Sequence, residues 1–232
     1  MVFPDFESEL ERLRLAEKPT LLLTREPSTP PASVALLSGS FDPMTVAHAA
    51  MAEAASRLVD LVLLVYSART LPKEGSAPPA LLTEGDRLQV LAGFCESHPK
   101  IAVGLCSHGL LAHQVAAARG RFPTASLFLV VGSDKVLQLL DPKWYDDRDS
   151  ALESLFGEAQ MLYAERAGEE GLTATALSRP ENVRWRDRFI RLEVPANVAS
   201  ISSRSVRSLL AAGRDVADVV VPEARPLIPS VD

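Results

Sequence analysis

The sequence contains few cysteines and histidines and no long apolar run. Its two cysteines, Cys95 and Cys106, form no C-x-x-C pair, and no histidine cluster accompanies them, which argues against a structural zinc site or other metal-ligating side chains. Apolar runs such as "LVLLVY" are too short to cross a bilayer. The N-terminus carries acidic residues where a signal peptide needs a basic region followed by an apolar one. We therefore expect a cytoplasmic protein with two reduced thiols.

An excess of positive charge is also missing. The formal net charge is −6 and the sequence pI is about 5.3, so no overall positive field attracts nucleic acid or an anionic membrane. We expect neither partner, although this balance permits a local cationic pocket for a small anion. The 232 residues, 47% of them hydrophobic, are enough for one domain with a real core. Assembly into a homo-oligomer stays open.

The first 31 residues differ in pattern from the rest. Within residues 5–15, three apolar side chains lie among charged ones at the spacing of an amphipathic helix. They are Phe6, Leu10 and Leu13. The proline-rich stretch "REPSTPPAS" follows and predicts a linker. We therefore expect an N-terminal helical appendage with its linker over residues 1–31, and the main domain over residues 32–232.

From residue 33 onward, short apolar runs alternate with helix-forming segments. The predicted strands lie at residues 33–38, 60–66, 100–106, 125–131, 159–165 and 188–195. Such alternation predicts an α/β fold with a doubly wound parallel sheet, right-handed crossovers and helices on both faces. In these folds ligands bind at the carboxyl ends of strands where the strand order reverses. The first strand-to-helix turn is therefore the place to look for a site.

That turn reads "GSFDPMTVAH" and carries features of an anion site. Gly39 permits a close backbone approach, and Phe41 can anchor the loop in the core. The helix is expected to begin near Thr45 or Val46, which places His48 in its first turn. Free N–H groups and the positive end of the helix dipole favour an anion there, and a histidine can donate a hydrogen bond to phosphate oxygens. The turn is neither a GxGxxG fingerprint nor a Walker loop.

A second stretch, "ISSRSVR" at residues 201–207, also follows a strand and opens a helix. Ser202 and Ser203 stand at the expected cap, and Arg204 and Arg207 lie one turn apart on one face. Alone, this stretch is more typical of a serine-capped helix with solvated arginines than of an anion site. Together, the two stretches predict two anion-binding helix starts in one chain.

The pair of motifs resembles the nucleotidyltransferase superfamily with the H-x-G-H-type signature. G-S-F-D-P-x-T-x-x-H and I-S-S-x-x-x-R are most similar to the nicotinamide/nicotinate mononucleotide adenylyltransferases, with Thr45 at the first histidine position. "VVGSDK", with Trp144 ten residues after Asp134, resembles the family's G-x-D…W region, and "LPKEG" supplies a lysine. The resemblance covers residues 34–213 and implies a Rossmann-like nucleotidyltransferase domain.

The resemblance also implies an activity and a set of roles. It implies that AMP passes from ATP to the phosphate of a pyridine mononucleotide, with Mg²⁺ accompanying ATP, so that NAD or deamido-NAD forms and pyrophosphate leaves. The implied catalytic residues are His48 and Arg207, and the implied acceptor contacts are Lys73 and Trp144. The implied ATP-binding residues are Gly39, Ser40, Phe41, Thr45, His48, Gly132, Asp134, Ser202, Ser203 and Arg207.

Three positions depart from the family pattern. Ser38 replaces a glycine, Arg204 replaces a threonine, and His108 stands where the family often has a second tryptophan. These changes leave the residues expected to bind the triphosphate intact, but they concern the identity of the acceptor. The alternatives are transfer to another phosphomonoester such as phosphopantetheine, cytidylyl transfer from CTP, and a non-catalytic nucleotide-binding module. The I-S-S-x-x-x-R form argues against the cytidylyl branch, whose motif resembles R-T-x-G-I-S-T.

Overall fold

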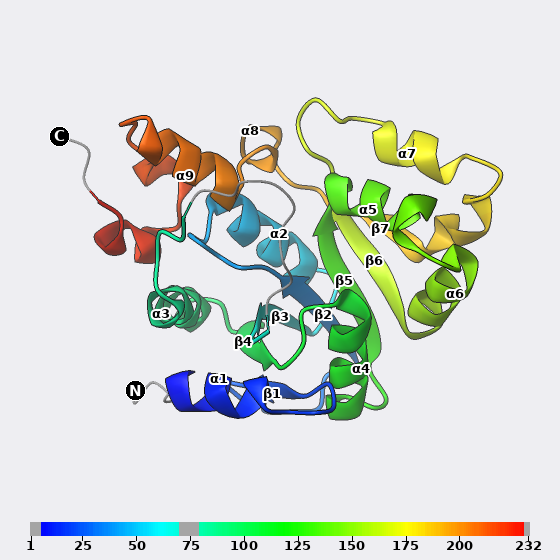
Figure 1. The fold of residues 1–232 in the computed structure, drawn as a ribbon, viewed down its shortest axis with the longest axis horizontal. Coiled ribbons are helices and arrows are strands. Elements are labelled where there is room, and N and C mark those ends of the chain that lie inside the picture. Colours follow the sequence, from blue (N-terminus) through cyan, green and yellow to red (C-terminus); the bar gives the residue numbers. More distant parts are fainter. Residues whose placement is uncertain (1–5, 70–78, 230–232) are drawn as a thin grey trace.

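The structure is a computed structural model that describes residues 6–69 and 79–229 (Figure 1). Its centre is a seven-stranded sheet in the order β1-β4-β3-β2-β5-β6-β7, parallel except for β1, which pairs antiparallel with β4. The strands are β1 (Leu21–Leu23), β2 (Ser33–Ser38), β3 (Leu61–Ser67), β4 (Ile101–Cys106), β5 (Ser126–Gly132), β6 (Ala159–Ala164) and β7 (Phe189–Arg191).

Helices cover both faces of this sheet. The hydrophobic core of one face takes side chains from α1 (Phe6–Arg14), α2 (Val46–Ser56), α3 (Glu84–Glu96) and α9 (Ser203–Ala211). The core of the other face takes side chains from α4 (Leu111–Arg121), α5 (Ser133–Leu140), α6 (Arg148–Glu158) and α7 (Leu172–Leu177). The short helix α8 (Ala196–Ala199) precedes α9, and 3-10 helices lie at Pro142–Trp144, Val183–Arg188, Ala217–Val219 and Pro222–Leu227. The predicted α/β, Rossmann-like architecture is therefore confirmed.

The central strands are apolar on both sides, because both of their faces are covered. Every residue of β3 and β4 is buried. Along β2, Ala35 and Leu37 enter one core cluster while Val34 and Leu36 enter the other, as the period-two alternation of a strand requires. Among the described residues, no helix is both long and apolar enough to cross a membrane.

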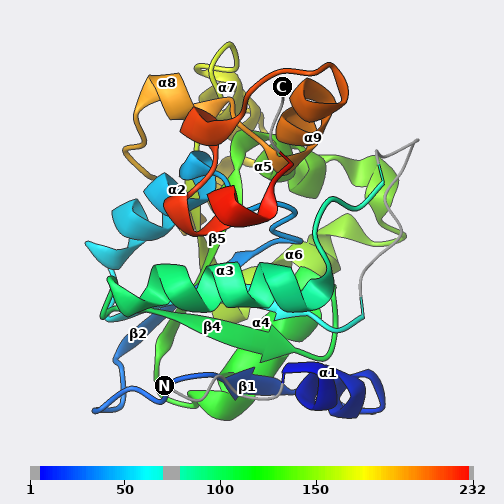
Figure 2. The ribbon, with the colours of Figure 1, turned by 90° about the vertical axis from the view of Figure 1, so that its left-hand side faces the viewer.

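The N-terminal segment packs onto the same sheet. Phe6, Leu10 and Leu13 of α1 are buried in the core cluster that α2 and α3 share. The strand β1, which the sequence did not reveal, pairs Leu21 with Cys106 of β4. Figure 2 shows α1 and β1 below β4, with α3 running alongside β4 above them. The domain boundary at residue 31 stays a prediction, but residues 6–23 contribute to the common sheet and core.

The strand order reverses beside β2. The chain leaves β2 through α2 and enters β3 on one side, whereas β5, reached later through α4, pairs with the other side of β2. In an open parallel sheet, a crevice forms at the carboxyl ends of the strands at such a point. The loop between β2 and α2 leaves the carboxyl end of β2 at this point, so the fold puts the predicted turn where a ligand is expected.

Candidate functional site

The loop that leaves β2 is held tightly against its neighbours. The Gly39 N–H donates to the Val65 carbonyl of β3 at 3.2 Å. A Cβ at Gly39 would lie 3.1 Å from Cζ of Phe41, so the ring of Phe41 occupies the space that a side chain would need. Phe41 is buried and has a φ of 45°, a left-handed conformation that is uncommon for a bulky residue. The loop therefore has one compact shape, with Phe41 as its anchor in the core.

His48 occupies the third position of α2, where the N-cap Thr45 holds its ring. The Thr45 backbone N–H donates to Nδ1 of His48 at 3.1 Å, and the Thr45 hydroxyl lies 2.7 Å from the same nitrogen. Because Nδ1 accepts a hydrogen bond, the neutral ring carries its proton on Nε2. Burial, and to a smaller extent the charge of Arg166, lowers the pKa of His48 from 6.5 to about 4. At neutral pH the residue is therefore an uncharged donor with a fixed tautomer.

Arg166 brings a positive charge close to His48, and sequence reasoning missed it. Its guanidinium forms a 3.1 Å ion pair with Asp134, and its backbone N–H donates to the Ser133 hydroxyl at 3.1 Å. A Cβ at Gly132 would come within 2.6 Å of the Asp134 carboxylate, so this strand end accepts only glycine without rearrangement. Arg166 comes two residues after β6, the neighbour of β5, which is the sequence signal that could have revealed it.

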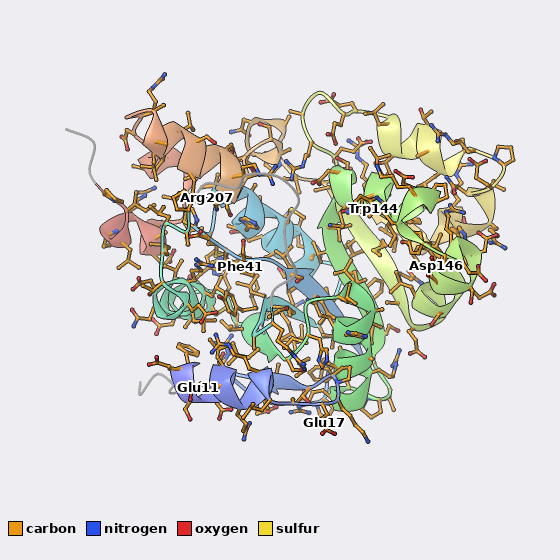
Figure 3. All side chains as sticks on the ribbon, viewed as in Figure 1. Glu11, Glu17, Phe41, Trp144, Asp146 and Arg207 are labelled. Carbon is orange, nitrogen blue, oxygen red and sulfur yellow. The ribbon has the colours of Figure 1, made fainter. Side chains whose placement is uncertain are left out.

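The second motif is bonded directly to the first loop. Ser202 caps α9 and forms a capping box with Ser205. The Ser203 hydroxyl donates to the Pro43 carbonyl at 2.8 Å, across 160 positions of sequence. Arg207, only 8% exposed, donates through Nη1 to the Asp42 carbonyl at 2.5 Å. Figure 3 shows Arg207 near Phe41, between α9 and the first loop. The two stretches that the sequence singled out thus form one continuous structure.

The carboxylate of Asp42 joins this structure to α3. It is 4% exposed and accepts hydrogen bonds from the backbone N–H groups of Leu81 and Leu82, with shortest distances of 3.1 Å and 2.9 Å. It also forms ion pairs with Arg87 at 3.5 Å and Arg207 at 3.4 Å. In the structure it links the loop, the start of α3 and α9.

Of the two predicted acceptor contacts, the described residues include only Trp144, and no bond joins it to this site. Trp144 ends the 3-10 turn after α5 and is 42% exposed, with the Lys143 ammonium 5.1 Å from its ring centroid. Within residues 6–69 and 79–229, no recorded contact links Trp144 with His48 or Arg207, and Figure 3 shows it beside α5, away from Phe41. Lys73 lies outside the described residues. The roles of both stay predictions.

The three departures from the family pattern differ in their surroundings. The Ser38 hydroxyl accepts a hydrogen bond from Gln114 at 2.9 Å, and Arg204 is exposed. His108 receives hydrogen bonds from Arg69. Ser40 is partly buried within the first loop.

In the part of the chain that the structure describes, no group of three or more His, Cys, Asp or Glu side chains could hold a metal ion. Binding of Mg²⁺ through the phosphates of ATP stays a prediction.

Comparison with known proteins gives a family match and a set of similar solved structures. The family model described as "Cytidylyltransferase-like" matches residues 36–209. A similar solved structure is the nicotinic acid mononucleotide adenylyltransferase of Plasmodium falciparum, complexed with APC. It has 16% sequence identity and a TM-score of 0.59, and the match covers 84% of this chain and 94% of the other. No curated protein sequence matches the chain. At this identity the structural match shows the fold alone.

Proposed function

The chain belongs to the cytidylyltransferase-like family of nucleotidyltransferases, and we propose that it transfers AMP from ATP to the phosphate of a pyridine mononucleotide. Pyrophosphate leaves, and the product is NAD or its deamido form. The family match supports nucleotidyl transfer in general. The choice of ATP and of a pyridine acceptor depends on the I-S-S-x-x-x-R motif and the family resemblance, and the acceptor named for the Plasmodium falciparum enzyme is consistent with it.

One observation carries this proposal: the two anion-binding helix starts are bonded to each other. The Ser203 hydroxyl donates to the Pro43 carbonyl. The Arg207 guanidinium contacts both the backbone carbonyl and the carboxylate of Asp42. The N-terminus of α2 and the N-terminus of α9 are therefore held in a fixed relation. A triphosphate carries several negative charges along its length, and two joined helix N-termini can bind more than one of its phosphoryl groups.

The chemistry needs positioning and charge neutralisation rather than a protein nucleophile. An oxygen of the acceptor phosphate attacks the α-phosphorus of ATP, the new P–O bond forms, and the bond from the α-phosphorus to the bridging oxygen of pyrophosphate breaks. His48, neutral and with its proton on Nε2, donates a hydrogen bond to the transferring phosphoryl group. Arg166 and Arg207 supply positive charge as negative charge grows on the leaving group. Mg²⁺ bound to ATP supplies further charge neutralisation.

The remaining residues take supporting roles in this proposal. Backbone groups of residues 39–41 contact phosphate oxygens, and Ser202 and Ser203 contribute donors at the α9 end. Asp134, next to the glycine that ends β5, accepts hydrogen bonds from ribose hydroxyls. Its ion pair with Arg166 holds the carboxylate in place for that role. Lys73 meets the acceptor phosphate, and Trp144 stacks on a planar ring.

A matrix of nucleotides and acceptors tests the proposal. Pyrophosphate release is measured with ATP or CTP against nicotinate mononucleotide, nicotinamide mononucleotide and phosphopantetheine. We expect release with ATP and a pyridine mononucleotide only. Release with phosphopantetheine as the only active acceptor would show that the acceptor is not a pyridine mononucleotide. Release with CTP as the only active donor would show that the donor is not ATP. No release in any combination, together with measurable ATP binding, would instead favour a non-catalytic nucleotide-binding module.

A further inference from the structure

Residues 165–171, which we call the β6–α7 loop, carry Arg166 and hold it by three attachments. The Arg166 backbone N–H donates to the Ser133 hydroxyl at 3.1 Å, and the Arg166 carbonyl accepts from the Glu169 N–H at 3.0 Å. The guanidinium makes two contacts with the Asp134 carboxylate, at 3.1 Å and 3.3 Å. Both backbone polar groups of Arg166 and its side chain are therefore bonded, although the residue lies in a loop.

Glu169 takes part in two of these three attachments. Besides its backbone bond to Arg166, its carboxylate accepts the proton of the Ser133 hydroxyl at 2.5 Å. A hydroxyl has one proton, so Ser133 gives it to Glu169 and offers a lone pair to the Arg166 N–H. Ser133 is fully buried, and a hydrogen bond to a carboxylate is stronger than one between neutral groups. Glu169 thus fixes the orientation of the hydroxyl that holds Arg166.

Two glycines and a second carboxylate give the β6–α7 loop its shape. Gly168 and Gly171 flank Glu169 and have φ values of 84° and 80°, which only glycine adopts without steric cost. The Gly171 N–H donates to the Glu165 carboxylate at 3.1 Å, and Glu165 forms an ion pair with Arg191 of β7 at 3.1 Å. The loop is therefore closed on itself and bonded both to the start of α5 and to β7.

The backbone attachments of Arg166 matter most while a nucleotide is bound. In the proposed function, Asp134 accepts hydrogen bonds from ribose hydroxyls, so the guanidinium shares this carboxylate with the nucleotide. The bonds through Ser133 and Glu169 are not shared in this way. They keep Arg166 in place while negative charge grows on the leaving pyrophosphate. A misplacement of about 1 Å in such a group lowers the rate on the order of 10²-fold.

We propose that Glu169 is a positioning residue for nucleotidyl transfer, acting through Ser133 and the β6–α7 loop on Arg166. This inference rests on the proposed function. Arg166 contacts the reacting phosphates, and Glu169 determines where Arg166 stands. The proposal gives a role in the reaction to a residue outside both anion-binding helix starts.

Steady-state kinetics of two Glu169 variants test this role. Glu169→Ala removes the acceptor for the Ser133 proton and should lower kcat by about tenfold or more. Glu169→Gln keeps an oxygen that accepts this proton and should hold kcat within about threefold of the wild type. The KM for the acceptor mononucleotide should change by less than about twofold in both variants, because Arg166 acts on the leaving group.

An Arg166→Ala background separates positioning from stability. A residue that acts through the Arg166 side chain has no further effect on the reaction once that side chain is gone. Glu169→Ala should therefore lower kcat by less than about twofold in this background. A purely structural role would lower turnover equally in both backgrounds. All rates are compared at a temperature at which thermal melts show every variant to be folded.

Glu170 offers a matched control in the same loop. It is exposed, and its carboxylate accepts from the Gly168 backbone N–H, with a shortest distance of 3.0 Å. Within the described part of the chain, no bond from Glu170 to Ser133 or Arg166 is recorded. Glu170→Ala removes a carboxylate next to Glu169 and should leave kcat within about twofold of the wild type.

An NMR titration of His48 reports on the position of Arg166 without any turnover. The charge of Arg166 is the smaller of two causes that lower the pKa of His48, after burial. This pKa should therefore rise in Arg166→Ala, where the charge is gone. It should also rise in Glu169→Ala, where the charge is displaced, and it should stay unchanged in Glu170→Ala.

The outcomes separate failure of this inference from failure of the proposed function. With transfer established, a kcat of Glu169→Ala within about twofold of the wild type overturns the role of Glu169 alone. An equal loss in the wild-type and Arg166→Ala backgrounds does the same. If no pyridine mononucleotide accepts AMP, the proposed function fails. The titration then still decides whether Glu169 places Arg166, and an unshifted pKa of His48 in Glu169→Ala overturns that placement.

Discussion

Replacing Asp42 with asparagine tests whether one carboxylate holds the two motifs together. The substitution keeps the size of the side chain and removes its charge. Asp42 is 4% exposed and faces two arginines and two backbone N–H groups, all of them donors. The asparagine NH₂ group would oppose some of these donors, and Arg87 and Arg207 would keep a buried charge without a counter-ion. Breaking a buried ion pair in this way costs about 3–5 kcal/mol.

Thermal unfolding measures this loss. For a chain of this size, 1 kcal/mol corresponds to about 2–4 °C in Tm, so Asp42→Asn should lower Tm by roughly 6–20 °C. Glu26→Gln is the control, because Glu26 pairs with Arg121 on the surface and an exposed pair contributes about 0–1 kcal/mol. Turnover of the folded variant should also fall, since Arg207 loses its partner. A Tm within about 2 °C of the wild type would refute the idea that Asp42 joins the loop, α3 and α9.

Four further predictions concern named side chains. His48→Ala should fold and lose about 10²–10³ in turnover, because a donor to developing charge is gone; steady-state rates check this, and near-wild-type turnover would show that the active site lies elsewhere. Because the pKa of His48 is lowered from 6.5 to about 4, the unfolded chain alone binds its proton between these values. Stability should therefore fall as pH drops from 6.5 to 4, less steeply in His48→Ala, as denaturant titrations would show. Arg207→Ala should raise KM for ATP and lower turnover; kinetics unchanged across ATP concentrations would reduce α9 to an ordinary capped helix. Nicotinamide mononucleotide without ATP should quench Trp144 fluorescence in a Trp185→Phe background, and Trp144→Ala should weaken the mononucleotide more than ATP; no quenching would remove Trp144 from the acceptor site.

The sheet could be predicted because its strands are short apolar runs covered on both faces. The runs at 33–38 and 60–66 match β2 and β3 within one residue at each end. The strand β1 could not be predicted in this way. It has only three residues, and what makes it a strand is its pairing with β4, a contact more than 80 positions away along the chain. The packing of α1 on the common core likewise depends on contacts between residues that lie far apart along the chain.

The site could be predicted in part, because its motifs are local but the bonds that join them are not. The cap of α2 by Thr45 and the place of His48 in its first turn follow from neighbouring residues. The bonds of Asp42 to Arg207 and to Leu82 join residues at large separations, which no local pattern specifies.

Transfer of a radioactive label from ATP tests the central claim most directly. With ATP labelled at the α-phosphate and a pyridine mononucleotide, we expect the label to appear in a dinucleotide, in step with pyrophosphate release. The same label should not appear in the dinucleotide when His48→Ala replaces the wild type at equal protein concentration and short times. Label that stays in ATP with every pyridine mononucleotide, or that moves to the dinucleotide equally fast in His48→Ala, would contradict the account.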